Sequence, residues 1–158
     1  MGIRLVNALG LMAAIAIGLS AADNSIGTWK RNVEKSKYTP AARNRIKSQI
    51  MVREAVDGGV KVTTWAQRAD GTPVNANYTV KYDGTPASVS AAGSLFDTVS
   101  TRQIDANTFM LEMKRSGGKY HTTGRMVISK DGKTMTMTLS GTDGDGKPVS
   151  NTLVWDRQ

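Results

Sequence analysis

From Ile46 onward, most segments of the chain alternate apolar and polar residues with a period of two. The segment 74–82 places Val, Ala, Tyr, Val and Tyr on one face and polar side chains on the other. The segment 134–139 alternates threonine with Met, Met and Leu in the same way. Such alternation predicts β-strands that bury one face and expose the other.

Turn-forming sequences separate these segments at nearly even spacing. Asp-Gly and Gly-Gly pairs supply the positive φ angles of tight hairpins, so each predicts a hairpin between antiparallel strands. The turn sequences are Asp57-Gly58-Gly59, Asp70-Gly71, Asp83-Gly84, Asp105-Ala106-Asn107, Gly117-Gly118, Asp131-Gly132 and Asp143-Gly144-Asp145-Gly146. Helical periodicity is nearly absent, and the polar segment from Val33 to Arg45, interrupted by Pro40, is interpreted as a loop with at most one helical turn. We therefore predict an all-β, antiparallel up-and-down meander of about eight to ten strands closed into a barrel.

The first residues have the pattern of a leader. Arg4 precedes an apolar run at 5–19, and Ser20-Ala21-Ala22 provides small residues before a cleavage point. The run is shorter than the roughly twenty apolar residues of a transmembrane anchor. We therefore expect a signal peptide at 1–22, cleavage after Ala22, one domain at 23–158, and a periplasmic or secreted product without a membrane anchor. The chain has no cysteine, which excludes disulfides and a lipid-bearing cysteine.

The chain is basic, with a formal net charge of +8 among its 158 residues. Its densest basic group (Lys30, Arg31, Lys35, Lys37, Arg43, Arg45 and Lys47) is scattered among other residues, as on the solvated face of strands. Such a surface attracts anionic partners, so an anionic envelope surface is one candidate partner. An exported protein without an aromatic-rich basic motif is not expected to bind nucleic acid.

Gly27-Thr28-Trp29 reads as G-x-W at the start of the first predicted strand, and Arg157 falls on the inward face of the last one. With the meander between them, these residues resemble the lipocalins and their calycin relatives. The segment "GTWKRNVEKSKYTP", with the later segments "DANT", "SKDGKT" and "GTDGDGKP", resembles sequences of a bacterial lipocalin-like family of exported proteins of unassigned function. The resemblance implies that Trp29 plugs one end of the barrel and that Arg157 packs across its indole. Other short lipocalin motifs are not apparent.

Period-two alternation assigns a set of side chains to the interior. The predicted inward residues are Trp29, Ile46, Ile50, Val52, Val60, Val62, Val74, Tyr78, Val80, Tyr82, Phe109, Leu111, Met113, Met126, Ile128, Met135, Met137, Leu153 and Trp155. These side chains either fill a small barrel or line a cavity. Adaptable Met and amphipathic Tyr and Trp side chains are well suited to line a cavity. The candidate ligand-binding residues are Tyr78, Tyr82, Phe109, Met113, Met126, Met135, Met137 and Trp155. Thr64 and Ala66 would leave room near an open end, and the irregular segment 85–99 would form a rim or a loose edge.

Candidate catalytic chemistry is sparse. His121 is the single histidine and alternates outward, opposite Tyr120; haem ligation by it is an alternative to a surface position. With no cysteine and one histidine, a zinc or copper site is not expected, and Asp143-Gly144-Asp145-Gly146 lacks the downstream glutamate of a calcium loop. The three glutamates, Glu34, Glu54 and Glu112, suggest no carboxylate pair. We expect no catalytic residues, metal or cofactor.

Three functions remain open from the sequence. The first is a non-enzymatic exported barrel that binds a small apolar or amphipathic molecule in its interior. The second is an envelope-associated interaction protein or inhibitor that uses its basic outer surface. The third is a small-barrel isomerase or cyclase that uses confined tyrosines.

Overall fold

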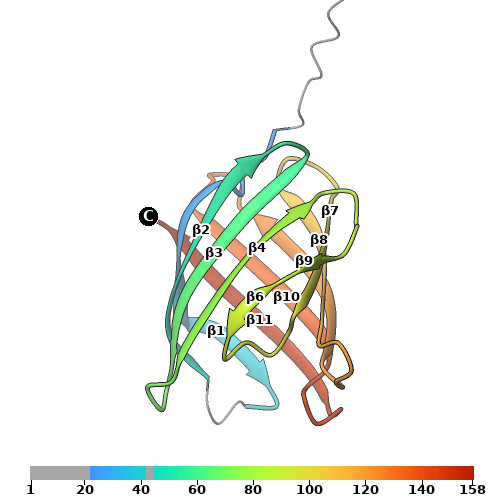
Figure 1. Ribbon diagram of the computed structural model, residues 1–158. Coiled ribbons are helices and arrows are strands. Elements are labelled where there is room, and N and C mark those ends of the chain that lie inside the picture. The colour runs from blue at the N-terminus through green and yellow to red at the C-terminus, as the bar shows by residue number, and fades with distance from the viewer. Residues whose placement is uncertain (1–21, 42–44) are drawn as a thin grey trace, which may run out of the picture.

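The strands form one antiparallel barrel (Figure 1). The computed structural model describes residues 22–41 and 45–158, so the predicted leader lies almost entirely outside the described residues. Within these ranges every regular element is a strand, which confirms the all-β, closed antiparallel prediction. Hydrogen-bonded neighbours follow the order β5-β7-β8-β9-β10-β11-β1-β2-β3-β4-β6. The strands are β1 (Gly27–Thr39), β2 (Ile46–Val56), β3 (Gly59–Arg68), β4 (Pro73–Lys81), β5 (Ala87–Ser88), β6 (Ser90–Ala92), β7 (Thr98–Gln103), β8 (Thr108–Lys114), β9 (His121–Ile128), β10 (Thr134–Thr142) and β11 (Pro148–Arg157).

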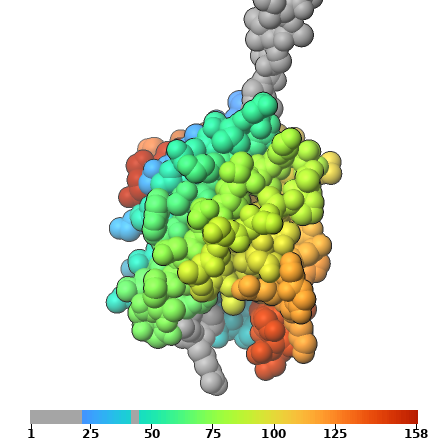
Figure 2. Space-filling model, viewed as in Figure 1, coloured from blue at the N-terminus to red at the C-terminus, as the bar shows by residue number. Residues whose placement is uncertain are grey.

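The predicted turns separate strands, and all but one join consecutive antiparallel partners. The exception is Asp83-Gly84, for which the hairpin prediction is wrong. The strand after it, β5, pairs with β7, and Asp83 itself forms an isolated bridge with Arg102. Figure 2 shows the chain between β4 and β7 in yellow-green, covering this side of the barrel. The short strands β5 and β6 thus occupy the seam where the sheet meets itself.

The prediction of a loop from Val33 to Arg45 is wrong for most of its length, because β1 continues to Thr39. The pairing of β1 with β11 shifts between Asn32 and Lys37, which marks a bulge. Side chains satisfy the backbone there: the Asn32 Oδ1 accepts from the Lys35 N–H at 3.0 Å, and the Ser36 hydroxyl accepts from the Val154 N–H at 3.0 Å. The extra residues also change which face points inward, so that Tyr38 reaches the interior.

The prediction that Ile50 and Val52 point inward is also wrong. Met51 and Arg53 are the buried residues of β2, at 5% and 4% exposure. Ile50 instead pairs with Trp65, whose side chain is exposed on the outer face. A second bulge, between Ile46 and Ser48, reverses the parity along β2, so that Ile46 does face the interior although Ile50 does not.

The remaining predicted inward positions lie inside the barrel, and most are buried. Trp29, Phe109, Met126 and Met135 are each 0% exposed. No helix long and apolar enough to cross a membrane occurs within residues 22–41 and 45–158.

Candidate ligand-binding cavity

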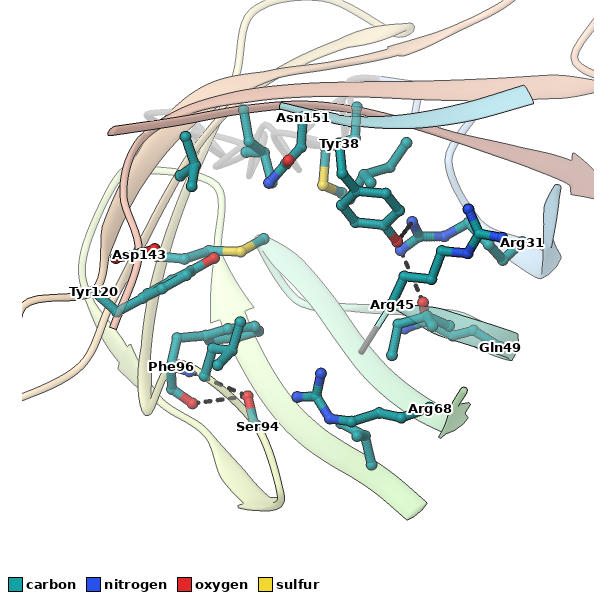
Figure 3. A pocket seen from close by; sticks show the side chains of 18 of the residues that line it. Arg31, Tyr38, Arg45, Gln49, Arg68, Ser94, Phe96, Tyr120, Asp143 and Asn151 are labelled. Atoms are coloured by element: carbon teal, nitrogen blue, oxygen red, sulfur yellow. Dashed lines mark hydrogen bonds between the residues drawn. The ribbon is translucent and has the colours of Figure 1, made fainter. Parts of the chain in front are cut away.

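A cavity of about 760 Å³ occupies one half of the barrel interior (Figure 3). It opens at the end where β1 is followed by Pro40 and Ala41 and where the 143–147 turn joins β10 to β11. Its wall is mainly apolar, and its apolar residues include Met51, Val74, Phe96, Met113, Met137, Leu139, Leu153 and Trp155. Its polar residues include Arg31, Tyr38, Arg45, Gln49, Thr64, Arg68, Tyr78, Tyr120 and Asn151. We call this region the open half.

The predicted ligand-binding residues divide between the two halves. Tyr78, Met113, Met137 and Trp155 line the cavity. The other four do not line it: they are Tyr82, Phe109, Met126 and Met135. Period two tells which face of a strand is inward but says nothing of depth along the barrel axis, so the sequence grouped packed and cavity-lining residues together.

The opposite end, the closed half, is filled by side chains and sealed around Trp29. Tyr82 and Phe109 pack there with ring centroids 5.2 Å apart. The Arg157 guanidinium lies 4.2 Å from the centroid of the Trp29 ring. The two residues are direct cross-strand partners of β1 and β11. The geometry therefore has the arrangement that the G-x-W resemblance implied for this end.

Every polar group of this Trp–Arg pair has a partner. The Trp29 indole N–H donates to the Ser25 carbonyl at 2.8 Å. Arg157 donates to the carbonyls of Gly132, Ile26 and Asn24 at 2.6, 2.7 and 2.6 Å.

Gly27 leaves the space that Arg157 needs. Its φ of +133° is unfavourable for other residues, and a Cβ placed there would lie 2.6 Å from Arg157 Nη1. The glycine of G-x-W is thus explained by the arginine that packs on its tryptophan.

A second arginine in the closed half is charge-balanced. Arg53 is 4% exposed and donates from Nε to the Ser25 hydroxyl at 3.0 Å and from Nη2 to the Tyr82 hydroxyl at 3.4 Å. Both hydroxyls in turn donate to the Asp23 carboxylate, the Ser25 bond being 2.6 Å long. The Ser25 and Tyr82 hydroxyls therefore bridge Arg53 to the negatively charged Asp23 carboxylate.

The open half contains a second Trp–Arg pair, formed by the next inward residues of the same two strands. Arg31 and Trp155 are cross-strand partners, and the Arg31 guanidinium lies 3.9 Å from the Trp155 ring centroid. Arg31 is 8% exposed. It donates to the Tyr38 hydroxyl at 3.3 Å and to Gln49 Oε1 at 2.8 Å. Arg31 Nε and the Trp155 indole N–H are buried without an acceptor among the described residues.

Burial changes the titration of the polar groups around the cavity. Loss of solvation lowers the pKa of Arg31 to about 10, an effect that the neighbouring Tyr38 partly offsets. Arg31 is therefore still a cation at neutral pH. Burial raises the pKa of Tyr78 and of Tyr120, so both hydroxyls stay protonated and are suited to hydrogen bonding rather than to base catalysis.

Sequence reasoning missed Arg31, Tyr38 and Gln49 as cavity residues. Arg31 was grouped with a solvated basic surface, although period two from the inward Trp29 places it inward as well. Tyr38 follows a bulge, and no pattern in the sequence marked the change of face there. Gln49 alternates in step with the buried Met51 and Arg53, and it was missed because Ile50 and Val52 were assigned to the inward face of β2. Figure 3 shows Arg31, Tyr38 and Gln49 on one side of the cavity, with Phe96 and Tyr120 across from them.

The irregular segment 85–99, which the sequence left open as a rim or a loose edge, contributes to the mouth of the cavity. Ser94, Leu95 and Phe96 line the cavity, and Phe96 stacks on Tyr120 with ring centroids 6.4 Å apart. Arg115 fixes this segment from outside by donating to the carbonyls of Ser94 and Leu95.

His121 lies on the outer surface, where its Nε2 is 2.8 Å from Glu112 Oε1. Its position agrees with the outward alternation and places the imidazole outside the cavity. No group of three His, Cys, Asp or Glu side chains suited to hold a metal occurs in the described ranges. The turn at 143–147 is a hairpin in which Asp143 Oδ1 accepts from the backbone of Asp145 and Lys147.

Comparison with known proteins does not assign the chain to a family. No protein-family model matches the chain, and no curated protein matches its sequence. A solved structure described as "Structure of EF1p2_mFAP2b bound to DFHBI" has a TM-score of 0.47 and 10% identity, covering 85% of this chain and 94% of that one. This similarity is too low to transfer a ligand, so the strand topology itself establishes the barrel.

Proposed function

We propose that the protein is a non-enzymatic, exported barrel that binds a small amphipathic molecule in the open half. The observation that carries the proposal is the cavity of about 760 Å³, with its mainly apolar wall and a few converging polar groups. Ligand pockets in proteins typically enclose about 300–1,000 Å³ and have this composition. Export is inferred from the leader-like residues at the N-terminus.

The cavity can be tested by filling it. Val74 lines the cavity on β4, whereas its neighbour Asn75 is exposed on the outer face. Val74→Trp should reduce binding of a fluorescent fatty-acid probe by about tenfold or more, because the indole occupies ligand space. Asn75→Trp adds the same side chain outside the barrel and should leave binding unchanged. Binding that is lost in neither variant, or that is absent in the unmodified protein, contradicts the proposal.

A second candidate is an interaction through the basic outer surface. Lys30, Lys35 and Lys37 of β1 are exposed, whereas Arg31 of the same group is buried and cannot contribute. This function predicts retention on anionic vesicles that falls with added salt and with neutralisation of the three lysines. Retention that is insensitive to salt would exclude it.

A further inference from the structure

Arg31 and Arg53 are the charged residues that are buried in the described parts of the chain. Arg53 is linked to the Asp23 carboxylate through Ser25 and Tyr82. No described carboxylate lies within ion-pair distance of Arg31. The two buried cations therefore differ in one respect: Arg53 has a counter-charge and Arg31 has none.

An isolated buried cation is strongly unfavourable, so its retention calls for a physical reason. The partners of Arg31 in the structure, the Tyr38 hydroxyl and the Gln49 amide oxygen, are neutral. Arg31 Nε and the Trp155 indole N–H have no acceptor at all among the described residues. The Tyr38 hydroxyl accepts from Arg31, so its own proton remains to be donated. Hydrogen-bond donors and a positive charge are therefore concentrated around Arg31 and Trp155. No negatively charged acceptor among the described residues balances them.

The rest of the cavity wall is suited to an apolar chain. Met51, Met113, Met137 and Leu153 line the same cavity as Arg31. Methionine side chains adapt to irregular apolar shapes, which favours flexible hydrocarbon over a rigid polar ligand. A ligand that fits both parts has one anionic group and one apolar body.

We propose that the ligand of the open half is a small amphipathic monocarboxylate, whose carboxylate binds Arg31 and Tyr38 and whose apolar body lies along the methionines. This inference rests on the proposed function and names its ligand class. Arg31 provides one positive charge, which a carboxylate balances. A phosphate monoester carries about 1.5–2 negative charges, which exceeds the single charge of Arg31 at this buried position.

The mouth of the cavity also favours an anion. Arg45, Arg68 and Lys147 are among its lining residues, against Asp143 and Asp145. The Asp143 carboxylate is engaged by the backbone N–H groups of its own turn. An approaching carboxylate therefore meets more positive than negative charge before it reaches Arg31.

The test compares probes of equal chain length by titration calorimetry: dodecanoate, dodecan-1-ol and dodecyl phosphate. Dodecanoate should bind the unmodified protein about tenfold or more tightly than dodecan-1-ol, because a charge-assisted hydrogen bond replaces a neutral one. Arg31→Met should remove most of this preference and keep binding of dodecan-1-ol. Lys30→Met is the matched control, since it removes the same charge from the adjacent, outward position of β1 and should keep the preference.

Each other outcome has a distinct meaning. Equal binding of dodecanoate and dodecan-1-ol by the unmodified protein overturns the carboxylate inference and leaves the proposed function intact. A preference that survives in Arg31→Met places the headgroup elsewhere and also overturns it. Tighter binding of dodecyl phosphate than of dodecanoate overturns the choice of carboxylate. If no probe binds, the proposed function itself fails.

Discussion

Two Trp–Arg pairs lie one inward position apart on the same two strands, yet they differ in how their polar atoms are satisfied. In the closed half, Arg157 on Trp29 donates to three backbone carbonyls, and the indole N–H has an acceptor. In the open half, Arg31 on Trp155 has neutral partners, and two buried N–H groups have no acceptor among the described residues. The first pair seals the closed half of the barrel. The second pair borders a cavity.

The difference shows that a stacking motif alone does not indicate a role. Stacking a guanidinium on an indole contributes about 0.5–2 kcal/mol wherever it occurs. What separates the pairs is whether the remaining donors and the charge are compensated within the protein. By this criterion the Trp29–Arg157 pair is structural and the Trp155–Arg31 pair is available to a ligand.

The largest expected effect is at Trp29. Trp29→Ala should lower the free energy of unfolding by about 3–5 kcal/mol, because it removes a fully buried aromatic ring from the packed half. Chemical denaturation followed by circular dichroism measures it. A change within about 0.5 kcal/mol would mean that Trp29 does not close the barrel.

The next effect is at Arg157. Arg157→Met should lower the free energy of unfolding by about 2–4 kcal/mol, since the carbonyls of Asn24, Ile26 and Gly132 lose their donor. The same denaturation experiment measures it. A variant as stable as the unmodified protein would remove the contrast between the two pairs.

The smallest effect, and the opposite direction, is expected at Arg31. Arg31→Met should leave the free energy of unfolding of the ligand-free protein unchanged or raise it by up to about 2 kcal/mol, because it removes a buried charge without a counter-charge. A loss of more than about 1 kcal/mol would show that Arg31 is as structural as Arg157. Lys30→Met, on the exposed side of the strand, should change stability by less than about 0.5 kcal/mol.

The Arg31 variant also has a predicted pH dependence. The pKa of Arg31 is about 10 in the folded protein, which is below its ordinary value, so folding disfavours the charged form. The resulting destabilisation is fully present below pH 10 and fades as the pH rises above 10. The stability advantage of Arg31→Met should therefore be constant from neutral pH to about pH 9 and shrink above pH 10. An advantage that grows above pH 10 would contradict this assignment.

The sequence predicts the barrel because its turn chemistry and period-two alternation agree with each other. The same alternation places Arg31 inward once Trp29 is inward, and the tight turn at Asp57-Gly58 pairs Arg53 with Val62. The inward position of both buried arginines could therefore have been predicted from the sequence. It was missed because only apolar residues were expected to point inward. Apolar Ile50 and Val52 looked like the inward set of β2 for the same reason.

Other features of the cavity cannot be predicted from period-two alternation and turn sequences. The bulge that brings Tyr38 to the cavity depends on side-chain hydrogen bonds and on pairing with β11, which is distant in the chain. The division of the interior into a packed half and a hollow half depends on depth along the barrel axis. Tyr82 and Tyr78 alternate identically in sequence, but they end up in different halves.

The most direct test of the account is short-range quenching of tryptophan fluorescence by a brominated dodecanoate. Trp155 borders the cavity, Trp29 lies in the packed half, and Trp65 is exposed outside the barrel. Trp155→Phe is a mild substitution, because the indole N–H that it removes has no acceptor among the described residues. We predict saturable quenching in the unmodified protein and in Trp65→Phe, and its loss in Trp155→Phe. Saturable quenching that persists in Trp155→Phe would place the ligand outside the open half and contradict the account.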